Sequence, residues 1–526
     1  MKRQQAFLLM LLVSSLLAGC KTEGLYENVL AIGTKVTLTK GVAFHEQTFD
    51  RVFYLEAGAG KASLKTLYQA QEGENILWLK PGESGQEVFY GFVAPSDPRD
   101  TRRTNALLQF RVKEGKVDRY PVGSYFDTLA LSPGGRFLVL YHGGSLADQG
   151  SDIYNPNEVT ILEPAKAAGD FNPKTVSIGI EGQRIEHIAF LDSLSVGGRS
   201  CEFGVFMARG AVKLIDLADP ALTGIKIQLV TDTDTRNVVP VEALAKAGDA
   251  LRDPMIFLRA SGSQDIYAVS LSLKTGGGFS ASLNQFEAGD TPYGMTLVEE
   301  PGETPTLLVL SWSNAYAGRG VVHVIDIDTA DTFTISIGDT PTRILSRAET
   351  AEHEVVLYGD QTAGVHFLKL DALSDEKGGN LEHLLIPERI RDVIPLGSDR
   401  LLLLPGSGSD LIILDLATRN MTRLFSAASY DWTQAQLSAG RFFLVPGGKD
   451  RIDTLDLTNG HPDSLVLDDA VVSLHLLSGS MAGVVFHDTP TGRVTVFPLS
   501  QPTRDKATVI DGLWLKDILD DTEVPR

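Results

Sequence analysis

The chain has 526 residues, of which 43% are hydrophobic and 22% charged, and its formal net charge is −20 at pH 7. The hydrophobic content indicates a globular chain and excludes a wholly disordered one. The acidic balance predicts repulsion from nucleic acid and from anionic lipid headgroups, so no nucleic-acid partner is expected. The 51 glycines and 24 prolines predict many turns and therefore many short elements.

The first predicted element is an apolar run at 6–17, which follows two basic residues. This layout is typical of a secretory signal peptide, and the run is shorter than the roughly 20 residues that span a bilayer. The run ends in LAGC at 17–20, which resembles the lipobox of bacterial lipoproteins. The resemblance implies cleavage before Cys20, acylation of Cys20, and attachment to a membrane through at least two acyl chains. Lys21 in the next position implies the outer membrane, with the chain facing the periplasm or the cell surface.

These features predict a signal peptide at 1–19 and a lipidated tether at 20–34. Cys201 is the other cysteine of the chain, so acylation of Cys20 leaves no partner for an intrachain disulfide. We expect Cys201 to be a small buried apolar residue and not a reactive thiol.

A six-residue apolar pattern recurs nine times from residue 107 onward, at spacings of 41 to 56 residues. The copies begin at Leu107, Val159, Val212, Ile266, Val322, Val365, Leu411, Ile452 and Val494. Further alternating apolar runs and glycine-containing turns surround each copy, and such alternation predicts β-strands. Four short strands per unit of about 40–50 residues are typical of a β-propeller blade.

Two stretches resemble known propeller repeats. The sequence VVHVIDIDTADTFTISIGDTP at 321–341 resembles the repeat of YVTN-type bacterial propellers, and SPGGR at 132–136 resembles the turn between the first two strands of a WD40-like blade. The resemblance implies an all-β fold at 72–526: a single β-propeller of about eight four-stranded blades, with seven to nine allowed. The strands expected at 35–71 would close the ring or form a cap.

One alternative accompanies this interpretation: the same strands could form two stacked smaller β domains. The helical period is nearly absent from the chain, and 241–250 is one of the few places where the sequence favours a short helix.

Signatures of known catalytic and metal sites are missing from the sequence. It contains no HExxH, no CxxC and no GxSxG, and it has no complete phosphate-binding loop. No cofactor and no metal are therefore expected. Asp326 and Asp331 lack the spacing of a calcium loop, and we expect them to bracket a turn.

In a propeller, the first residues of each innermost strand face the central channel. Aligning the repeats places several polar and aromatic residues in or beside one such column: Asp127, Glu186, Arg343, Arg391, Tyr125, Tyr293 and Trp432. A mouth of this composition suits a peptide or a glycan. Alternatively, the charges pair with one another and serve only to keep the channel hydrated, without binding a ligand.

The sequence thus predicts a lipid-anchored propeller of the bacterial envelope that acts as a non-enzymatic platform for a protein or glycan partner. The alternative is a propeller enzyme of the lactonase or hydrolase type with its site at the central channel.

Overall fold

The computed structural model describes the following residues: 32–47, 50–58, 61–83, 87–97, 104–143, 155–165, 173–179, 184–220, 224–229, 238–246, 253–275, 278–289, 291–298, 305–313, 319–347, 354–359, 362, 364–370, 381–386, 388–396, 399–405, 410–425, 432–458, 460–489 and 492–511. The predicted signal peptide, Cys20 and residues 20–31 of the predicted tether lie outside them. No helix among the described residues has the length and apolar character needed to cross a membrane.

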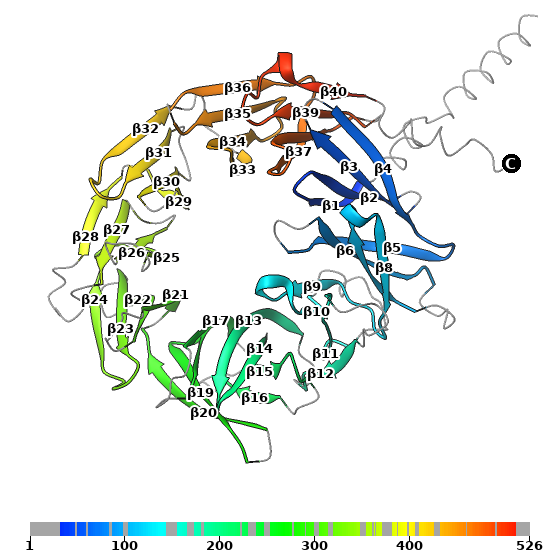
Figure 1. Ribbon diagram of the computed structural model, residues 1–526. Coiled ribbons are helices and arrows are strands. Elements are labelled where there is room, and N and C mark those ends of the chain that lie inside the picture. Colours follow the sequence, from blue (N-terminus) through cyan, green and yellow to red (C-terminus); the bar gives the residue numbers. More distant parts are fainter. Residues whose placement is uncertain are drawn as a thin grey trace, which may run out of the picture. The chain divides into compact units, whose positions relative to one another are not determined.

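The described strands form ten four-stranded sheets, each a meander of four consecutive antiparallel strands (Figure 1). The chain divides into two compact units. Unit 1 takes Met1–Gly123 and Asp431–Arg526, and unit 2 takes Ser124–Tyr430.

Unit 1 contains four sheets. They are β1 (Ile32–Thr37), β2 (Gly41–Glu46), β3 (Arg51–Gly58), β4 (Lys61–Gln69); β5 (Glu74–Pro81), β6 (Val88–Pro95), β7 (Ala106–Arg111), β8 (Lys116–Pro121); β33 (Trp432–Ser438), β34 (Arg441–Pro446), β35 (Arg451–Asp456), β36 (Pro462–Val466); and β37 (Val471–Leu477), β38 (Ala482–His487), β39 (Val494–Pro498), β40 (Thr508–Ile510). Short 3₁₀ helices lie at Val112–Glu114 and Arg504–Lys506.

Unit 2 contains six sheets. They are β9 (Thr128–Leu131), β10 (Leu138–Tyr141), β11 (Glu158–Leu162), β12 (Lys174–Ser177); β13 (Ile185–Val196), β14 (Arg199–Ala208), β15 (Ala211–Asp216), β16 (Ile225–Gln228); β17 (Val239–Lys246), β18 (Met255–Ser261), β19 (Asp265–Leu273), β20 (Phe279–Glu287); β21 (Thr291–Val298), β22 (Thr306–Ser313), β23 (Arg319–Asp326), β24 (Thr332–Ser336); β25 (Arg343–Arg347), β26 (Glu354–Tyr358), β27 (Gly364–Lys369), β28 (Leu381–Leu385); and β29 (Ile390–Pro395), β30 (Arg400–Pro405), β31 (Asp410–Asp415), β32 (Met421–Phe425).

The four-stranded antiparallel meander is the construction of a propeller blade, so the prediction of an all-β fold built from such blades is confirmed. The predicted number of blades, seven to nine with eight as the central value, is wrong: the described residues contain ten. All nine copies of the six-residue pattern lie in third strands of sheets. The strands expected at 35–71 belong to the tenth sheet, β1–β4, which has four strands like the others.

Two local predictions have opposite outcomes. The SPGGR turn does connect the first two strands of a sheet, with a 3₁₀ turn at Pro133–Gly135 between β9 and β10. Gly134 and Gly135 have φ of 72° and 64° there, which is the left-handed region that glycine tolerates. Over 241–246 the favoured helix is wrong, because β17 occupies Val239–Lys246, and residues 247–250 lie outside the described residues.

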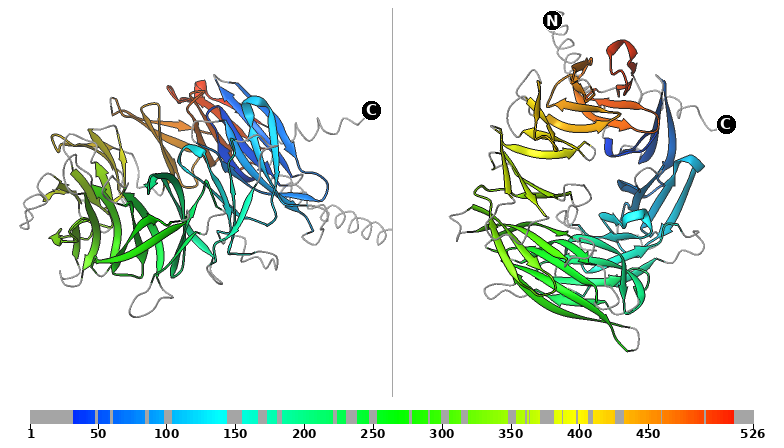
Figure 2. Two further views of the ribbon diagram at one scale, coloured as in Figure 1. Left: turned by 60° about the horizontal axis from the view of Figure 1, so that its bottom comes forward. Right: turned by 60° about the vertical axis from the view of Figure 1, so that its left-hand side comes forward.

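Clusters of buried apolar side chains join successive sheets within each unit, and Figure 2 shows these sheets from two further sides. In unit 2, for example, Val205 of β14 and Tyr267 of β19 belong to one cluster of fully buried side chains. In unit 1, Phe44 of β2 and Phe486 of β38 share another cluster, with ring centroids 5.7 Å apart. Third strands are buried on both faces, which explains their continuous apolar pattern.

Aspartates at the ends of third strands fix the turns that follow. The carboxylate of Asp326 accepts hydrogen bonds from the backbone N–H of Asp328 at 2.8 Å and of Thr329 at 3.0 Å. The backbone N–H of Asp326 donates to the carbonyl of Asp331 at 2.9 Å. The prediction that Asp326 and Asp331 bracket a turn is confirmed.

Candidate functional site

The first strands of the six sheets of unit 2 lie along the inner side of the arc that these sheets form (Figure 1). Glu186, Tyr293, Arg343 and Arg391 all lie on these strands, β13, β21, β25 and β29 respectively. Asp127 directly precedes β9. The candidate site therefore has one residue on or beside the first strand in five of the six sheets of this unit.

Trp432 is placed differently from the other six residues of the predicted column. It begins β33 and belongs to unit 1, whereas the others belong to unit 2. The candidate site is therefore restricted to residues of unit 2.

The first strands share a β-bulge, in which one extra residue is inserted opposite the second strand. In β21, Pro292 pairs with Ser311 and Gly294 pairs with Leu310, so Tyr293 has no paired residue. Eight of the ten described sheets carry an extra residue in the first strand, and β9 and β25 do not. In β1 the insertion lies between Ile32 and Lys35. In the other seven the inserted residues are Leu77, Glu186, Val241, Tyr293, Arg391, Thr433 and Val472. A bulge at a sheet edge redirects a side chain, and here it recurs near the start of the first strand in β13, β17, β21 and β29 of unit 2 but not in β9 or β25.

The bulged side chains are accessible to solvent. Tyr293 is 37% exposed, Arg391 is exposed, and Glu186 and Val241 are half-buried. We call Glu186, Val241, Tyr293 and Arg391 the bulge row of unit 2. It offers a carboxylate, an aliphatic group, a phenol and a guanidinium on four different sheets.

Charged residues of the site pair with neighbouring side chains. Arg343 Nη1 donates to Asp392 Oδ1 of the next sheet at 3.2 Å, and both side chains are about half exposed. Arg184 Nε donates to Glu186 Oε1 at 3.4 Å. These two pairs join residues of the predicted column to neighbours outside it, so they are not the pairing of column charges with one another that the alternative expects.

A second ion pair supports the bulge at Tyr293. Arg259 Nε donates to Glu242 Oε2 at 2.6 Å, and Arg259 Nη1 donates to the carbonyl of Pro292 at 3.2 Å. The Pro292 carbonyl directly precedes Tyr293, so Arg259 of β18 holds the backbone of the neighbouring sheet where the phenol projects.

Asp127 is buried and Tyr125 beside it is half-buried, and both contact residues at the end of β10. Asp127 is 3% exposed, and its Oδ1 accepts hydrogen bonds from the Gly143 backbone N–H at 2.6 Å and from the Thr128 hydroxyl at 2.9 Å. The ring of Tyr125 stacks on His142 with centroids 6.3 Å apart. Burial raises the pKa of Tyr125 and lowers that of His142. These contacts hold the start of β9 against the end of β10.

Sequence reasoning missed Asp392, Glu242 and Arg259. Asp392 directly follows Arg391 in the chain, and this adjacency was the one feature of the sequence that could have pointed to it. The ion pair of Asp392 with Arg343 joins residues of two sheets, so no local pattern contains it. Glu242 follows the bulge of β17, inside the region read as a helix.

Two histidines of third strands, the buried His366 and the half-buried His323, form polar pairs with residues of fourth strands. His366 Nδ1 lies 2.8 Å from His383 Nδ1, and His323 Nδ1 lies 3.2 Å from the hydroxyl of Thr334. His366 Nε2 also lies 3.5 Å from Asp339 Oδ2 in the segment that enters β25. Burial lowers the pKa of His366 to about 4. Among the described residues, no three His, Cys, Asp or Glu side chains are grouped so as to hold a metal.

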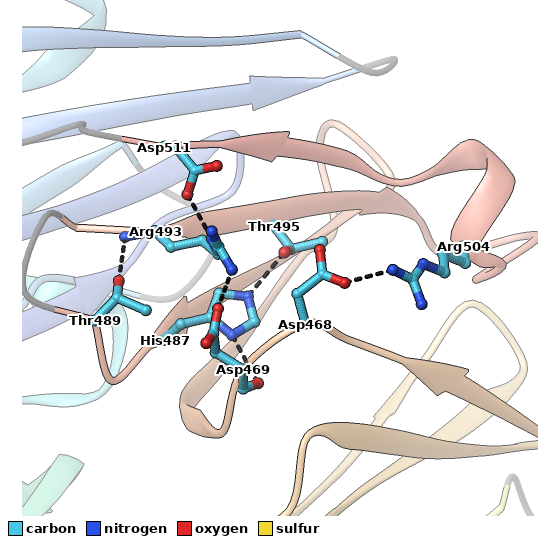
Figure 3. A network of polar contacts seen from close by, with 8 residues as sticks. All are labelled: Asp468, Asp469, His487, Thr489, Arg493, Thr495, Arg504 and Asp511. Carbon is cyan, nitrogen blue, oxygen red and sulfur yellow. Dashed lines mark hydrogen bonds and ion pairs between the residues drawn. The ribbon is translucent and has the colours of Figure 1, made fainter.

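A network of charged residues lies in the last sheet of unit 1 (Figure 3). Arg493 bridges Asp469 and Asp511, and Arg504 pairs with Asp468. His487 Nδ1 donates to the carbonyl of Asp469 at 3.0 Å. These contacts tie the segment that enters β37 to the β38–β39 turn and to the residue after β40, so the network is structural.

Cys201 is 1% exposed, as expected for a small buried apolar residue. Burial raises the pKa of its thiol to about 11, which disfavours the reactive thiolate near neutral pH.

Comparison with protein-family models finds no match, and no curated protein matches the chain. Similar solved structures include dihydro-heme d1 dehydrogenase NirN in complex with DHE, with 11% identity, 77% of this chain and 71% of that chain covered, and a TM-score of 0.36. Apo AztD from Citrobacter koseri has 10% identity, coverage of 69% and 92%, and a TM-score of 0.33. The Cps50 (Swd1) β-propeller domain of Myceliophteria thermophila has 11% identity, coverage of 65% and 96%, and a TM-score of 0.33. Similarity this distant carries no argument about function.

Proposed function

We propose that this chain is a lipid-anchored, non-enzymatic binding platform of the bacterial envelope, which holds an extended peptide or glycan segment along the bulge row of unit 2. The observation that carries the proposal is the recurrence of the bulge, which gives four of the six sheets of the unit one accessible side chain each near the start of the first strand.

A row of contact points suits an extended partner better than a compact one. A small molecule is usually enclosed by a concave pocket, whereas an extended chain can use separate contacts along its length. Tyr293 can stack on a sugar ring or an apolar side chain, and Glu186 and Arg391 can contact polar groups on either side.

The ion pairs beside the row do not oppose binding strongly. The Arg343–Asp392 pair is about half exposed, and such surface pairs contribute only about 0–1 kcal/mol. A partner with hydroxyl, amide or charged groups can therefore replace one half of this pair at little cost.

The row is tested by placing a photo-cross-linking phenylalanine analogue at Tyr293 in intact cells. The matched control carries the same analogue at Val466, which is 47% exposed at the end of β36. We expect a discrete adduct at Tyr293 that weakens when Arg391→Ala is added. Equal labelling at both positions, or no adduct at Tyr293, would contradict the proposal.

The lipid anchor rests on the LAGC sequence at 17–20. Cys20→Ser should abolish incorporation of a palmitate analogue and release the protein into the soluble fraction or leave it unprocessed. Cys201→Ser is the matched control and should leave incorporation unchanged. A Cys20→Ser protein that stays processed and membrane-bound would count against the anchor.

No observation within the described residues favours the lactonase- or hydrolase-type alternative, and we do not propose it.

A further inference from the structure

Two histidines of one sheet face each other across neighbouring strands. His366 of β27 and His383 of β28 are directly paired in the register, and their Nδ1 atoms lie 2.8 Å apart. The ring centroids are 4.3 Å apart, and the ring planes are inclined by 39°. The two residues are 17 positions apart in the chain, so the pair arises from the fold and from no short sequence motif.

The carboxylate of Asp339 lies at the other side of the His366 ring. His366 Nε2 is 3.5 Å from Asp339 Oδ2, in the segment that enters β25. This carboxylate favours a proton on Nε2, which leaves a lone pair on Nδ1, the atom that faces His383. Metal-bound histidines commonly direct their second ring N–H at a carboxylate in this way.

Both rings can present a lone pair near neutral pH. The His366 side chain is fully buried, and burial lowers its pKa to about 4, so its imidazole is neutral, which is the form that binds a metal ion. His383 is exposed, so exchange with water can move its proton from Nδ1 to Nε2. The two Nδ1 atoms can then share one ion, and neither ring has to lose a proton.

The distance between the two Nδ1 atoms indicates which ion fits. Imidazole nitrogens lie about 2.0 Å from a divalent transition-metal ion. Two such ligands are about 2.8 Å apart at the 90° angle of a tetragonal site and about 3.3 Å apart at the tetrahedral angle of zinc. The observed 2.8 Å matches the tetragonal arrangement, which is typical of Cu²⁺.

We propose that His366 and His383 form a binding site for Cu²⁺, in which the two Nδ1 atoms occupy adjacent coordination positions and water fills the others. Asp339 is a positioning residue that acts through His366. No group of three His, Cys, Asp or Glu side chains suited to a metal occurs within the part of the chain that the structure describes, so the site has two protein ligands. It lies on third and fourth strands, whereas the bulge row lies on first strands, so this proposal does not depend on the bulge row (Figure 1).

The preceding sheet provides a comparison within the same molecule. His323 and His366 are both the second residue of their copy of the six-residue pattern. The residue paired with His323 is Thr334 of β24, whose hydroxyl lies 3.2 Å from His323 Nδ1. This pair offers only one imidazole, so it should bind Cu²⁺ more weakly than two imidazoles do.

Titration of the purified full-length protein with Cu²⁺ near neutral pH, with glycine as a competitor for weak sites, tests the proposal. We expect one equivalent of bound ion and an electron paramagnetic resonance spectrum of tetragonal Cu²⁺ coupled to two imidazole nitrogens. His383→Gln, at an exposed position, should abolish this equivalent. His323→Gln is the matched control and should retain it.

Circular dichroism verifies that each variant keeps its β-sheet signal. A parent protein that binds no stoichiometric Cu²⁺ overturns the proposal. So does folded His383→Gln protein that binds the ion as well as the parent, because the bound ion would then lie elsewhere in the chain.

Asp339→Asn tests the positioning role of the carboxylate. The asparagine oxygen can still accept the hydrogen bond that the Thr340 backbone N–H donates to Asp339 Oδ1 at 2.8 Å, but the charge beside His366 is lost. We expect the affinity for Cu²⁺ to fall by about 10–100-fold, while the spectrum still shows two nitrogens. Unchanged affinity, or coupling to a single nitrogen, would contradict the role assigned to Asp339.

Discussion

Arg419 joins two neighbouring sheets of unit 2 through one side chain. It lies in the turn before β32 with φ of 56°, and its Nη2 donates to Glu354 Oε2 at 2.6 Å. The Glu354 side chain is fully buried on β26. The guanidinium also lies 3.7 Å from the ring centroid of Phe367, so charge and aromatic contacts act on the same group.

Arg419→Ala should destabilise the protein by about 3–5 kcal/mol, because Glu354 is left buried without its cation. Urea unfolding measures the change. Arg423→Ala is the control, since Arg423 pairs with the partly exposed Glu388 and its loss should cost at most about 1 kcal/mol. Similar losses in both variants would show that burial of Glu354 is not what makes the Arg419 pair important.

Buried neutral histidines predict a loss of stability in mild acid. Burial lowers the pKa of His366 and of His475 to about 4. The unfolded chain takes up these protons near pH 6.5, so stability is full above that pH and falls as the pH decreases toward 4. Each group accounts for about 3 kcal/mol over this window.

His475→Gln tests this pH dependence, because glutamine can bond Thr37 and Ser473 without titrating. Thermal unfolding between pH 7 and 4.5 should show a shallower decline in this variant than in the parent. His187→Gln, at an exposed position of β13, should leave the slope unchanged. Identical slopes in all three proteins would contradict the assignment.

At the scale of the single element, the hairpin between third and fourth strands depends on one carboxylate. Asp216 Oδ1 accepts a hydrogen bond from the Ala218 N–H at 3.2 Å, and Asp216 Oδ2 accepts one from Arg199 Nη2 at 2.7 Å. Asp216→Asn can keep the turn bond and loses the ion pair, whereas Asp216→Ala loses both. We expect the melting temperature to fall from the parent to Asp216→Asn and further to Asp216→Ala. The Asp216→Ala variant should lose about 1–3 kcal/mol of unfolding free energy. Equal losses would show that the turn bond is unimportant.

The sequence identified third strands better than first strands for a physical reason. Third strands are buried on both faces and read as continuous apolar runs, such as VHFLKL in β27. First strands carry the bulge, and the extra residue shifts the alternation of exposed and buried side chains by one position. In β17 the bulge at Val241 breaks the strand pattern, which explains the mistaken helix. The strands of the first sheet were expected at 35–71, but the sequence did not show that they form a complete four-stranded sheet like the others.

The candidate site was only partly accessible to sequence reasoning. Glu186, Tyr293 and Arg391 were singled out from aligned repeats, but a bulge is defined by the partner strand and cannot be read from one strand alone. Asp127 was selected for its charge, yet it is buried and bonded to local donors. The pairing of Arg343 with Asp392 depends on the contact between two sheets, which no local pattern contains.

At the scale of the whole molecule, unit 1 joins segments from opposite ends of the chain. Phe44 of the first sheet contacts Phe486 of the last sheet, and both lie in one buried cluster. Phe44→Ala and Phe486→Ala should each cost about 3–5 kcal/mol. The double variant should cost less than the sum, because both remove the same contact, and a double-mutant cycle by urea unfolding measures this coupling. Strict additivity would contradict a shared core.

Unit 1 consists of two chain segments separated by unit 2, so its core cannot be completed until the second segment has been synthesised. Residues before Gly123 leave the ribosome first, but the strands that cover their apolar face follow only after all of Ser124–Tyr430 has been made. At about 5–20 residues per second, that delay is roughly 15–60 s. During this interval the apolar face of β2 and β3 lacks the strands that bury it in the folded unit, whereas unit 2 can complete its own core from one continuous segment.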